Sequence, residues 1–534
     1  MYKYMEEYRQ NLASELLNSE VRRLPSDMQG IDITDEFQKV LEATHDEAIA
    51  QKETHREVTN SSVKTMKHKL SVLFEKIKGK ISSTETSFDD IISLATSYCN
   101  MGIVYKDGTT EEDLVNGQSY LKKCLDLLNG KELDPRAILL IMRASVQLDR
   151  VFCQLNEAEK CCSFSHKAIG FYLEYTKQGS EFPAPIVSRL SVNLDIEEAC
   201  SNTMLSLVTL CSELLYHINN CECDTWDVET LVKPMHNFFM NQWIEATANP
   251  VTKGYAWASA TVDFSRFFIN QLRLSDTRNY LAAAEYILDA YKEEVKKYVS
   301  GNFSTPAFLN ILECVATRWS IFGNKVLLCS KYNLFNVFKN VKVSRVGNYK
   351  STPSVELPTK SLIFTDLEVD IEHIVSKIPL NVSNLDDVVV VCDHIMKWFE
   401  MFKTHVSTEI YNSSFMVRTL CLIEVGNYLT YFEADKVEQM KCHKERIEFL
   451  INEHNFISSK DKNVFGILHL HCNFQLMLTY GKLLDMILED AEITEKRFED
   501  VEKEVHNYVQ SSAEYSKKYL EELDFLFSDC EKQD

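Results

Sequence analysis

Histidine and cysteine side chains that lie close together in a sequence can bind a metal ion, and the segment HLHC, His469 to Cys472, is the densest group of this kind in the chain. Structural zinc sites use four such ligands, and catalytic sites use three with a water molecule. On a helix, His469 and Cys472 share one face, whereas His471 points elsewhere. Two ligands do not make a zinc site, so this segment predicts no bound metal.

A cysteine next to a histidine can also form a nucleophile with its base, and Cys442 and His443 stand together in KCHKE. Adjacent residues on a helix diverge, so this pair does not favour catalysis. The sequence lacks the phosphate-binding, nucleophile-elbow, zinc-protease and dinucleotide motifs G-x-x-x-x-G-K-[ST], G-x-S-x-G, HExxH and G-x-G-x-x-G. We therefore predict no catalytic residue, no cofactor and no small-molecule substrate, and an enzyme with a cryptic all-helical site is the least favoured class.

The chain has 16 cysteines without a framework spacing and without a CxxC pair. Most stand among apolar neighbours, as Cys124 does, and we interpret Cys161-Cys162 and Cys221-x-Cys223 as packing residues rather than redox pairs. Small buried thiols of this kind are typical of reduced proteins of the cytosol. The cysteines therefore predict a cytoplasmic protein.

The formal net charge of −22 limits the partners that the protein can bind. Nucleic-acid binders show a basic footprint, which is missing here, and an acidic surface repels phosphates while it attracts basic partners. No run of about 18 apolar residues is present, so no membrane span is predicted. The charge excludes nucleic acid and favours a basic protein partner, although solubility alone would also account for it.

Glycine and proline are scarce, with 15 and 10 residues among 534. These two residues punctuate loops and sheets, so their scarcity predicts an all-α protein with few long loops. We expect four segments: N-terminal helices in residues 1–85, helical repeats in 86–300, a linker helix and a long loop in 301–365, and C-terminal helical repeats in 366–534. Within the third segment, the loop is expected near residues 341–365.

The acidic C-terminal segment predicts a terminal helix with one buried face. Its apolar residues recur with the 3.6-residue period of a helix, whereas the other positions are mostly charged or polar. The expected buried stripe consists of Phe498, Val501, Val505, Tyr508 and Val509.

One segment, FSRFFINQLRLSDTRNYLAAA, has the spacing of a tetratricopeptide repeat. The first helix of this repeat carries large residues in the pattern W-x2-L-G-x2-Y. The second helix carries a small residue followed by a large one, in the pattern A-x3-F. Phe264 and Phe268 match the first half, whereas Thr277 and Leu281 match the second. These residues are expected in the core between two helices, with Ser275 and Asp276 in the turn, capping the second helix.

The same pattern recurs at other places in the chain, although not at the standard period of about 34 residues, so the helices must be longer than in the standard repeat. These signatures predict a right-handed, tetratricopeptide-like solenoid of antiparallel helix pairs. The further matches are Tyr98, Met101, Gly102 and Tyr105 with Gly117, Leu121 and Cys124; Leu148, Asp149 and Phe152 with Cys161, Ser165 and Ala168; and Leu207, Val208 and Cys211.

Three segments are more specific than the repeat pattern: LATSYCNMGIVYKDGTTEEDLVNGQSYLKKCLDLL (94–128), YAWASATVDFSRFFINQLRLSDTRNYLAAA (255–284) and YFEADKVEQMKCHKERIEFL (431–450). Together, in this order, they resemble the kinesin-family-binding proteins over roughly residues 60–500. The middle loop is shorter here than in that family.

The resemblance implies a non-catalytic regulator that binds the motor domains of kinesins and covers the surface with which they grip microtubules. It further implies a role in cargo transport and a cytoplasmic, cytoskeleton-associated location, with only an indirect link to microtubules. A generic helical-repeat scaffold that binds peptides or other cytosolic proteins remains the alternative.

The resemblance makes the central helices the expected wall that contacts the motor. If Phe264 and Phe268 face the core, polar residues on another face of the same helix line the concave side of the solenoid, where partners usually bind. Neighbouring helices contribute to the same wall. The predicted partner-binding residues are Thr209, Gln242, Glu245, Asp263, Arg266 and Asn270.

Overall fold

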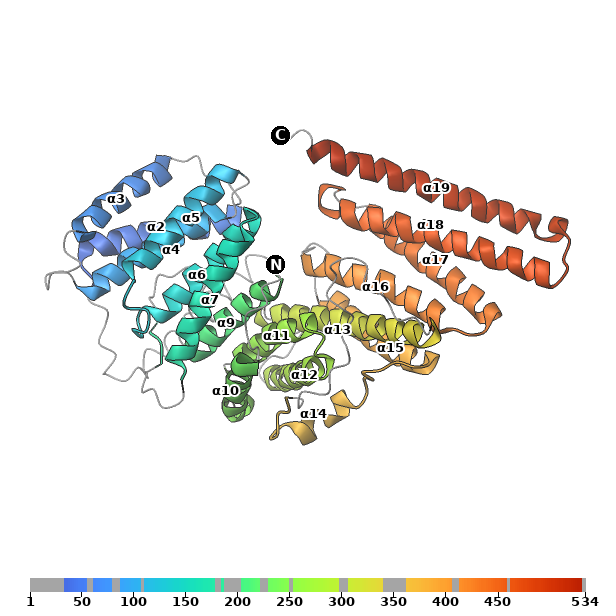
Figure 1. Ribbon diagram of the computed structural model, residues 1–534, viewed down its shortest axis with the longest axis horizontal. Coiled ribbons are helices and arrows are strands. Elements are labelled where there is room, and N and C mark those ends of the chain that lie inside the picture. The colour runs from blue at the N-terminus through green and yellow to red at the C-terminus, as the bar shows by residue number, and fades with distance from the viewer. Residues whose placement is uncertain are drawn as a thin grey trace. The chain divides into compact units, whose positions relative to one another are not determined.

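The computed structural model describes residues 33–54, 61–78, 87–106, 110–177, 184–186, 203–220, 229–248, 253–296, 306–339, 362–405, 413–458 and 462–530. Within these ranges the regular elements are all helices (Figure 1), which confirms the predicted all-α fold. The right-handed twist of the solenoid stays a prediction.

The chain forms two compact units, Met1–Ala199 and Cys200–Asp534. The division into four parts that the sequence suggests stays a prediction. The described helices of the first unit are α2 (Asp35–Thr54), α3 (Ser61–Lys78), α4 (Phe88–Lys106), α5 (Glu111–Leu127), α6 (Ile138–Gln154) and α7 (Ala158–Tyr175).

Helices α4 and α5 pack closely because a glycine stands at their contact. A Cβ atom on Gly102 would lie 2.5 Å from Cγ of Leu121, so only glycine permits this approach. Tyr98 and Cys124 are also buried here. The first repeat signature is therefore confirmed as inter-helix core. Thr110 caps α5, because its hydroxyl accepts a hydrogen bond from the Asp113 N–H at 3.1 Å.

Helix α6 is buried along almost its whole length, because α4, α5 and α7 all pack against it. Leu148 and Phe152 are fully buried, as are Cys161 and Ser165 on α7. The second repeat signature is thus also confirmed as core. Asn156, with φ 56°, turns the chain between the two helices, a backbone conformation that asparagine adopts more readily than most residues.

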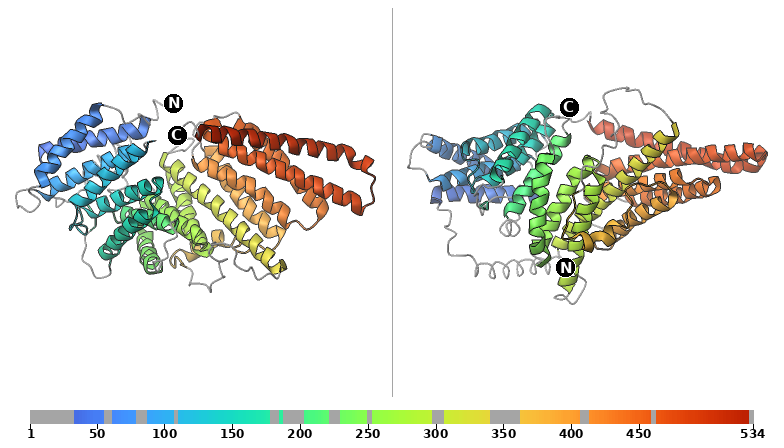
Figure 2. Two further views of the ribbon diagram at one scale, coloured as in Figure 1. Left: turned by 45° about the horizontal axis from the view of Figure 1, so that its top comes forward. Right: turned by 60° about the horizontal axis from the view of Figure 1, so that its bottom comes forward.

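The second unit contains a longer series of helices that lie side by side (Figure 2). Its described helices are α9 (Thr203–Asn220), α10 (Glu229–Ala248), α11 (Tyr255–Asn270), α12 (Leu274–Lys296), α13 (Pro306–Lys339), α14 (Glu368–Val375), α15 (Leu385–His405), α16 (Ser413–Phe432), α17 (Lys436–Ser458), α18 (Lys462–Ile493) and α19 (Phe498–Cys530).

The central helices of this unit pack as two rows. In the first row, α11 contacts α9 and α13. In the second row, α12 contacts α10 and α14. Consecutive helices cross between the rows, as α11 and α12 do. Stacked helix pairs with two such rows are the architecture of an α-solenoid.

The segment that matched the repeat pattern best forms α11 and α12. Phe264, Phe268, Thr277 and Leu281 are all fully buried, so their assignment to the inter-helix core is confirmed. The turn differs from the prediction, because α12 already begins at Leu274.

Ser275 and Asp276 therefore lie in the first turn of α12 and not in the loop before it. The buried Asp276 carboxylate accepts hydrogen bonds from Arg273 Nε at 2.6 Å and from the Leu362 N–H at 2.7 Å. Leu272, with φ 55°, makes the turn instead. The sequence shows the polar pair but not that its carboxylate binds a distant part of the chain.

Residues 341–361 of the predicted long loop lie outside the described residues, but its end is tightly packed. Phe364 is 2% exposed, and its ring contacts those of Trp257 and Tyr280. His236 on α10 binds the carbonyl of Ile363 at 3.1 Å through Nε2. We call residues 362–364 the anchor segment, because contacts to α10, α11 and α12 hold it.

The terminal helix α19 packs along α18, but not with the whole of the predicted stripe. Phe498 and Val509, expected in the buried stripe, are 58% and 47% exposed. The contact instead includes Tyr515, whose ring stacks on Tyr480 of α18, and Ser512, whose hydroxyl donates to the Met477 carbonyl. The predicted stripe is wrong at these two positions, because tyrosines mixed with polar residues form the actual interface.

Candidate protein-binding surface

Helix α11 presents a polar face between α9 and α13. Its other face is buried through Trp257, Phe264 and Phe268. The polar face carries Asp263, Arg266 and Asn270, of which the first two are half-buried and Asn270 is exposed. Polar side chains at these positions contribute little to the apolar core, and charged residues of the neighbouring helices surround Asp263.

Charged side chains from three helices meet around Asp263. The pKa of the Asp263 carboxyl is raised to about 6, mainly by burial and in smaller part by the nearby Glu213 carboxylate of α9. Arg318 of α13 and Arg266 of α11 oppose this shift. We call Glu213, Asp263, Arg266 and Arg318 the charged row, since it runs across α9, α11 and α13.

A buried arginine from α16 extends the same line of charge. Arg418 Nη1 donates to Thr317 Oγ1 of α13 at 2.7 Å and to the Glu313 carbonyl at 3.4 Å. Burial lowers the pKa of Arg418 to about 10. Helix α13 is therefore held between polar contacts to α11 on one side and to α16 on the other.

The sequence-based prediction did not include Glu213 and Arg318 of the charged row, nor Arg418 beside it. None of them lies in a repeat signature, and their approach to α11 and α13 depends on how the helices stack. The only signal was an arginine inside the apolar run of residues 415–425, where a charge needs a partner.

The remaining predicted partner residues lie on other parts of the helices. Thr209 on α9 is half-buried, and its hydroxyl donates to the Leu205 carbonyl at 3.0 Å. Gln242 and Glu245 come from α10, which packs against α11 and α12 and so belongs to the other row. The Glu245 side chain lies outside the described residues. That all six residues form one surface stays a prediction.

The histidines of HLHC and KCHKE and the cysteine of HLHC lie at packing positions, whereas Cys221 and Cys223 lie outside the described residues. His469 and Cys472 are both buried in α18, whereas His471 binds Glu424 Oε1 of α16 at 3.1 Å. Burial lowers the pKa of His443 to about 4, since α17 places this side chain inside. Each of these side chains is accounted for by helix packing.

A sequence profile described as "KIF-1 binding protein C terminal" matches residues 255–533 of the chain. The chain belongs to the KIF-binding protein family. The match begins with the first residue of α11 and covers the helices from α11 to α19. Asp263, Arg266 and Arg318 of the charged row therefore lie within the matched residues, whereas Glu213 precedes them.

Individual relatives support this assignment over most of the chain. A KIF-binding protein of Drosophila melanogaster is 21% identical over 409 residues, which are 71% of this chain and 64% of that protein. The KIF-binding protein of Homo sapiens is 19% identical over 456 residues, 81% of this chain and 70% of that protein. The chain thus spans slightly less than two thirds of the Drosophila relative.

No solved structure matches the chain. Among the helices that the structure describes, none combines the length and the apolar character needed to cross a membrane.

Proposed function

We propose that this protein binds kinesin motor domains and prevents their attachment to microtubules. The observation that carries this proposal is the family match over residues 255–533, since the relatives are named for binding KIF proteins. Its location would be the cytoplasm, at the cytoskeleton, and its effect on cargo transport would follow from the motor that it holds.

Charge supports an inhibitory effect. Microtubules are acidic, so the motor surface that grips them is basic, as the resemblance to the family implies. A protein with a formal net charge of −22 is attracted to such a surface. By covering it, the protein would compete with the microtubule for the same part of the motor.

The proposed contact lies on α11 and its neighbours. Two members of the charged row, Asp263 and Arg266, are among the six predicted partner residues. Because the row carries both signs of charge, it favours the one alignment of a charged partner in which opposite charges face each other. Other alignments would bring like charges together, which is unfavourable. Asn270 adds an exposed amide at the end of the same helix.

Microtubule co-sedimentation of a panel of kinesin motor domains tests the function. With the protein in excess, bound motors are expected to move from the microtubule pellet to the supernatant. If every motor of the panel stays in the pellet and none binds the protein in a pull-down, the proposal is wrong and a scaffold for other partners is favoured.

A triple variant, Gln242→Ala, Asp263→Asn and Arg266→Ala, tests the surface. Asparagine is used at position 263 because a lysine would add a cation beside Arg318 and Arg266. Affinity for a motor that binds the parent is expected to fall at least tenfold, about 1.4 kcal/mol.

A matched control carries the same types of change on α19 and the turn before it. Arg497→Ala, Asp500→Asn and Gln510→Ala alter three exposed residues outside the proposed surface. The control should bind like the parent. If both triple variants bind equally well and stay folded, the contact lies elsewhere on the protein, whereas the co-sedimentation result still decides the function.

A further inference from the structure

Two cysteines and an aspartate meet at the end of the hairpin formed by α6 and α7. Cys161 Sγ lies 2.8 Å from Asp149 Oδ1 and 3.5 Å from Cys153 Sγ. One ligand atom from each of the three residues lies within 4.8 Å of the others, which among the described residues is the one such group of His, Cys, Asp and Glu. Three convergent ligand atoms of this kind can hold a metal ion.

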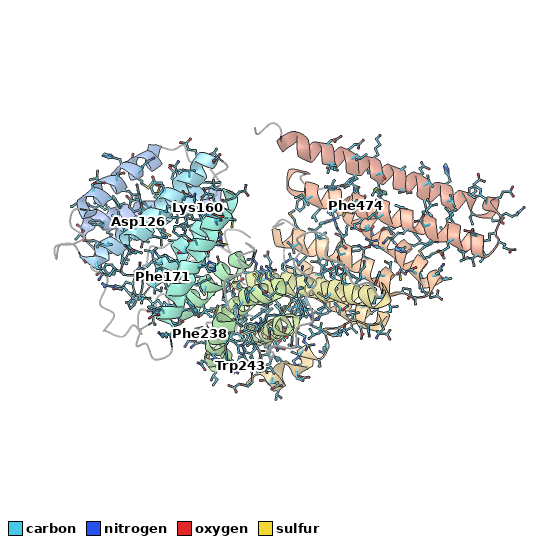
Figure 3. All side chains as sticks on the ribbon, in the orientation of Figure 1. Asp126, Lys160, Phe171, Phe238, Trp243 and Phe474 are labelled. Atoms are coloured by element: carbon cyan, nitrogen blue, oxygen red, sulfur yellow. The ribbon has the colours of Figure 1, made fainter. Side chains whose placement is uncertain are left out.

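Local structure explains why these side chains meet. Asp149 and Cys153 are four residues apart on α6 and so project from the same face. The turn after α6 is closed by the Glu157 N–H, which donates to the Phe152 carbonyl at 2.9 Å. This returns the chain so that Cys161, in the first turn of α7, faces α6. In Figure 3 the labelled Lys160 marks this end of α7.

The two distances from Cys161 Sγ, to Asp149 Oδ1 and to Cys153 Sγ, are short enough for each pair of atoms to share one ion. Two sulfur atoms 3.5 Å apart subtend an angle of roughly 100° at a zinc ion about 2.3 Å from each. The 2.8 Å between Cys161 Sγ and Asp149 Oδ1 subtends roughly 80° at the same ion. Lengthening this second distance by about 0.8 Å brings the angle to the tetrahedral value.

Burial and access also fit a bound ion. Asp149 and Cys161 are fully buried, whereas Cys153 is exposed. An ion can therefore enter at Cys153, and water can occupy the fourth position there. Ser165 on α7 donates a hydrogen bond to Asp149 Oδ1 at 2.5 Å, and such neighbours orient a ligating carboxylate.

We propose that Asp149, Cys153 and Cys161 form a zinc site that joins α6 to α7, with water as the fourth ligand. Thiolate ligands favour zinc over magnesium and calcium, which prefer oxygen. On binding, each thiol releases its proton to solvent and each thiolate forms a bond to the ion. The site lies in the first unit and does not depend on the kinesin proposal.

Titration of the reduced, metal-free full chain with Co²⁺, followed by displacement with Zn²⁺, tests this site. Cobalt bound to thiolates absorbs light through sulfur-to-metal charge transfer, so the spectrum reports the ligands directly. We expect one equivalent of Co²⁺ with this absorption, and its loss when Zn²⁺ is added. Cys153→Ser should lower the affinity at least tenfold, and because Cys153 is exposed this variant should fold.

The control is Cys314→Ser, which replaces another exposed cysteine, on α13. It should bind metal like the parent. Zinc should also raise the melting temperature of the parent and of this control, but not that of Cys153→Ser. If Cys153→Ser binds cobalt as tightly and with the same spectrum as the parent, or if the parent shows no thiolate absorption, the proposed site is wrong.

Discussion

Replacing Gly102 by alanine is expected to destabilise the first unit, although alanine is the better helix former. Alanine in a helix interior gains about 1 kcal/mol over glycine. Its Cβ would, however, lie 2.5 Å from Cγ and 2.7 Å from Cδ2 of Leu121. Leu121 is fully buried, so moving it would disturb the packing of its neighbours. Overpacking of a core costs typically 1–3 kcal/mol, so a net loss of about 1 kcal/mol is expected.

Gly170 on α7 provides a matched control, because a Cβ there meets no atom within 4 Å. Gly170→Ala should therefore show the helix propensity alone and stabilise the unit by about 1 kcal/mol. For a unit of this size, each variant should shift the melting temperature by about 2–4 °C, in opposite directions. The comparison isolates the contact with Leu121 from the effect of alanine itself.

The five tryptophans of the chain all lie in the second unit, so their fluorescence reports the unfolding of that unit alone. Far-ultraviolet circular dichroism follows the helices of both units, whereas tryptophan fluorescence follows the second unit. The Gly102→Ala shift is expected in the dichroism transition and not in the fluorescence transition. A Gly102→Ala protein at least as stable as the parent would refute the argument, since α4 and α5 would then tolerate the added methyl group.

Two further predictions concern charge. The association rate with a bound motor domain should fall as salt rises, because exposed charges are screened within about 8 Å at physiological ionic strength; stopped-flow rates that do not change with salt would contradict an acidic docking surface. The raised pKa of Asp263, about 6 against an ordinary 3.8, means that the folded state holds this proton more tightly than the unfolded state. The free energy of unfolding therefore loses this contribution as pH rises from about 4 to about 6. Asp263→Asn should be more stable than the parent at pH 7 and lose that advantage near pH 4, and parallel melting profiles over this range would show that Asp263 is not enclosed.

The helical fold and much of the core were predictable because residues that are buried between packed helices recur in the sequence with the period of a helix. Phe264 and Phe268 on one helix and Leu281 on the next have the large residues that a helix pair must bury. Gly102 could be identified in the same way, since a small residue stands where two helices approach.

Contacts between particular polar side chains of different helices could not be predicted from spacing. Spacing places Asp149 and Cys161 in one repeat signature, but it does not show that their side chains meet when α7 folds back on α6. The charged row was missed for a similar reason, since Glu213 and Arg318 are separated from Asp263 by many residues. On α19, the contact made by Tyr515 was missed because this residue lies outside the predicted stripe, although its aromatic ring buries a large area.

The anchor segment makes the two halves of the second unit complementary pieces. Leu362 and Ile363 bind α10 and α12 through Asp276, Asn279 and His236. Helix α13 also packs directly on α15 and α16. The unit therefore does not depend on the covalent link between residues 339 and 362 to bring its halves together. Two separately expressed polypeptides that end and begin in this interval are therefore expected to associate through these contacts.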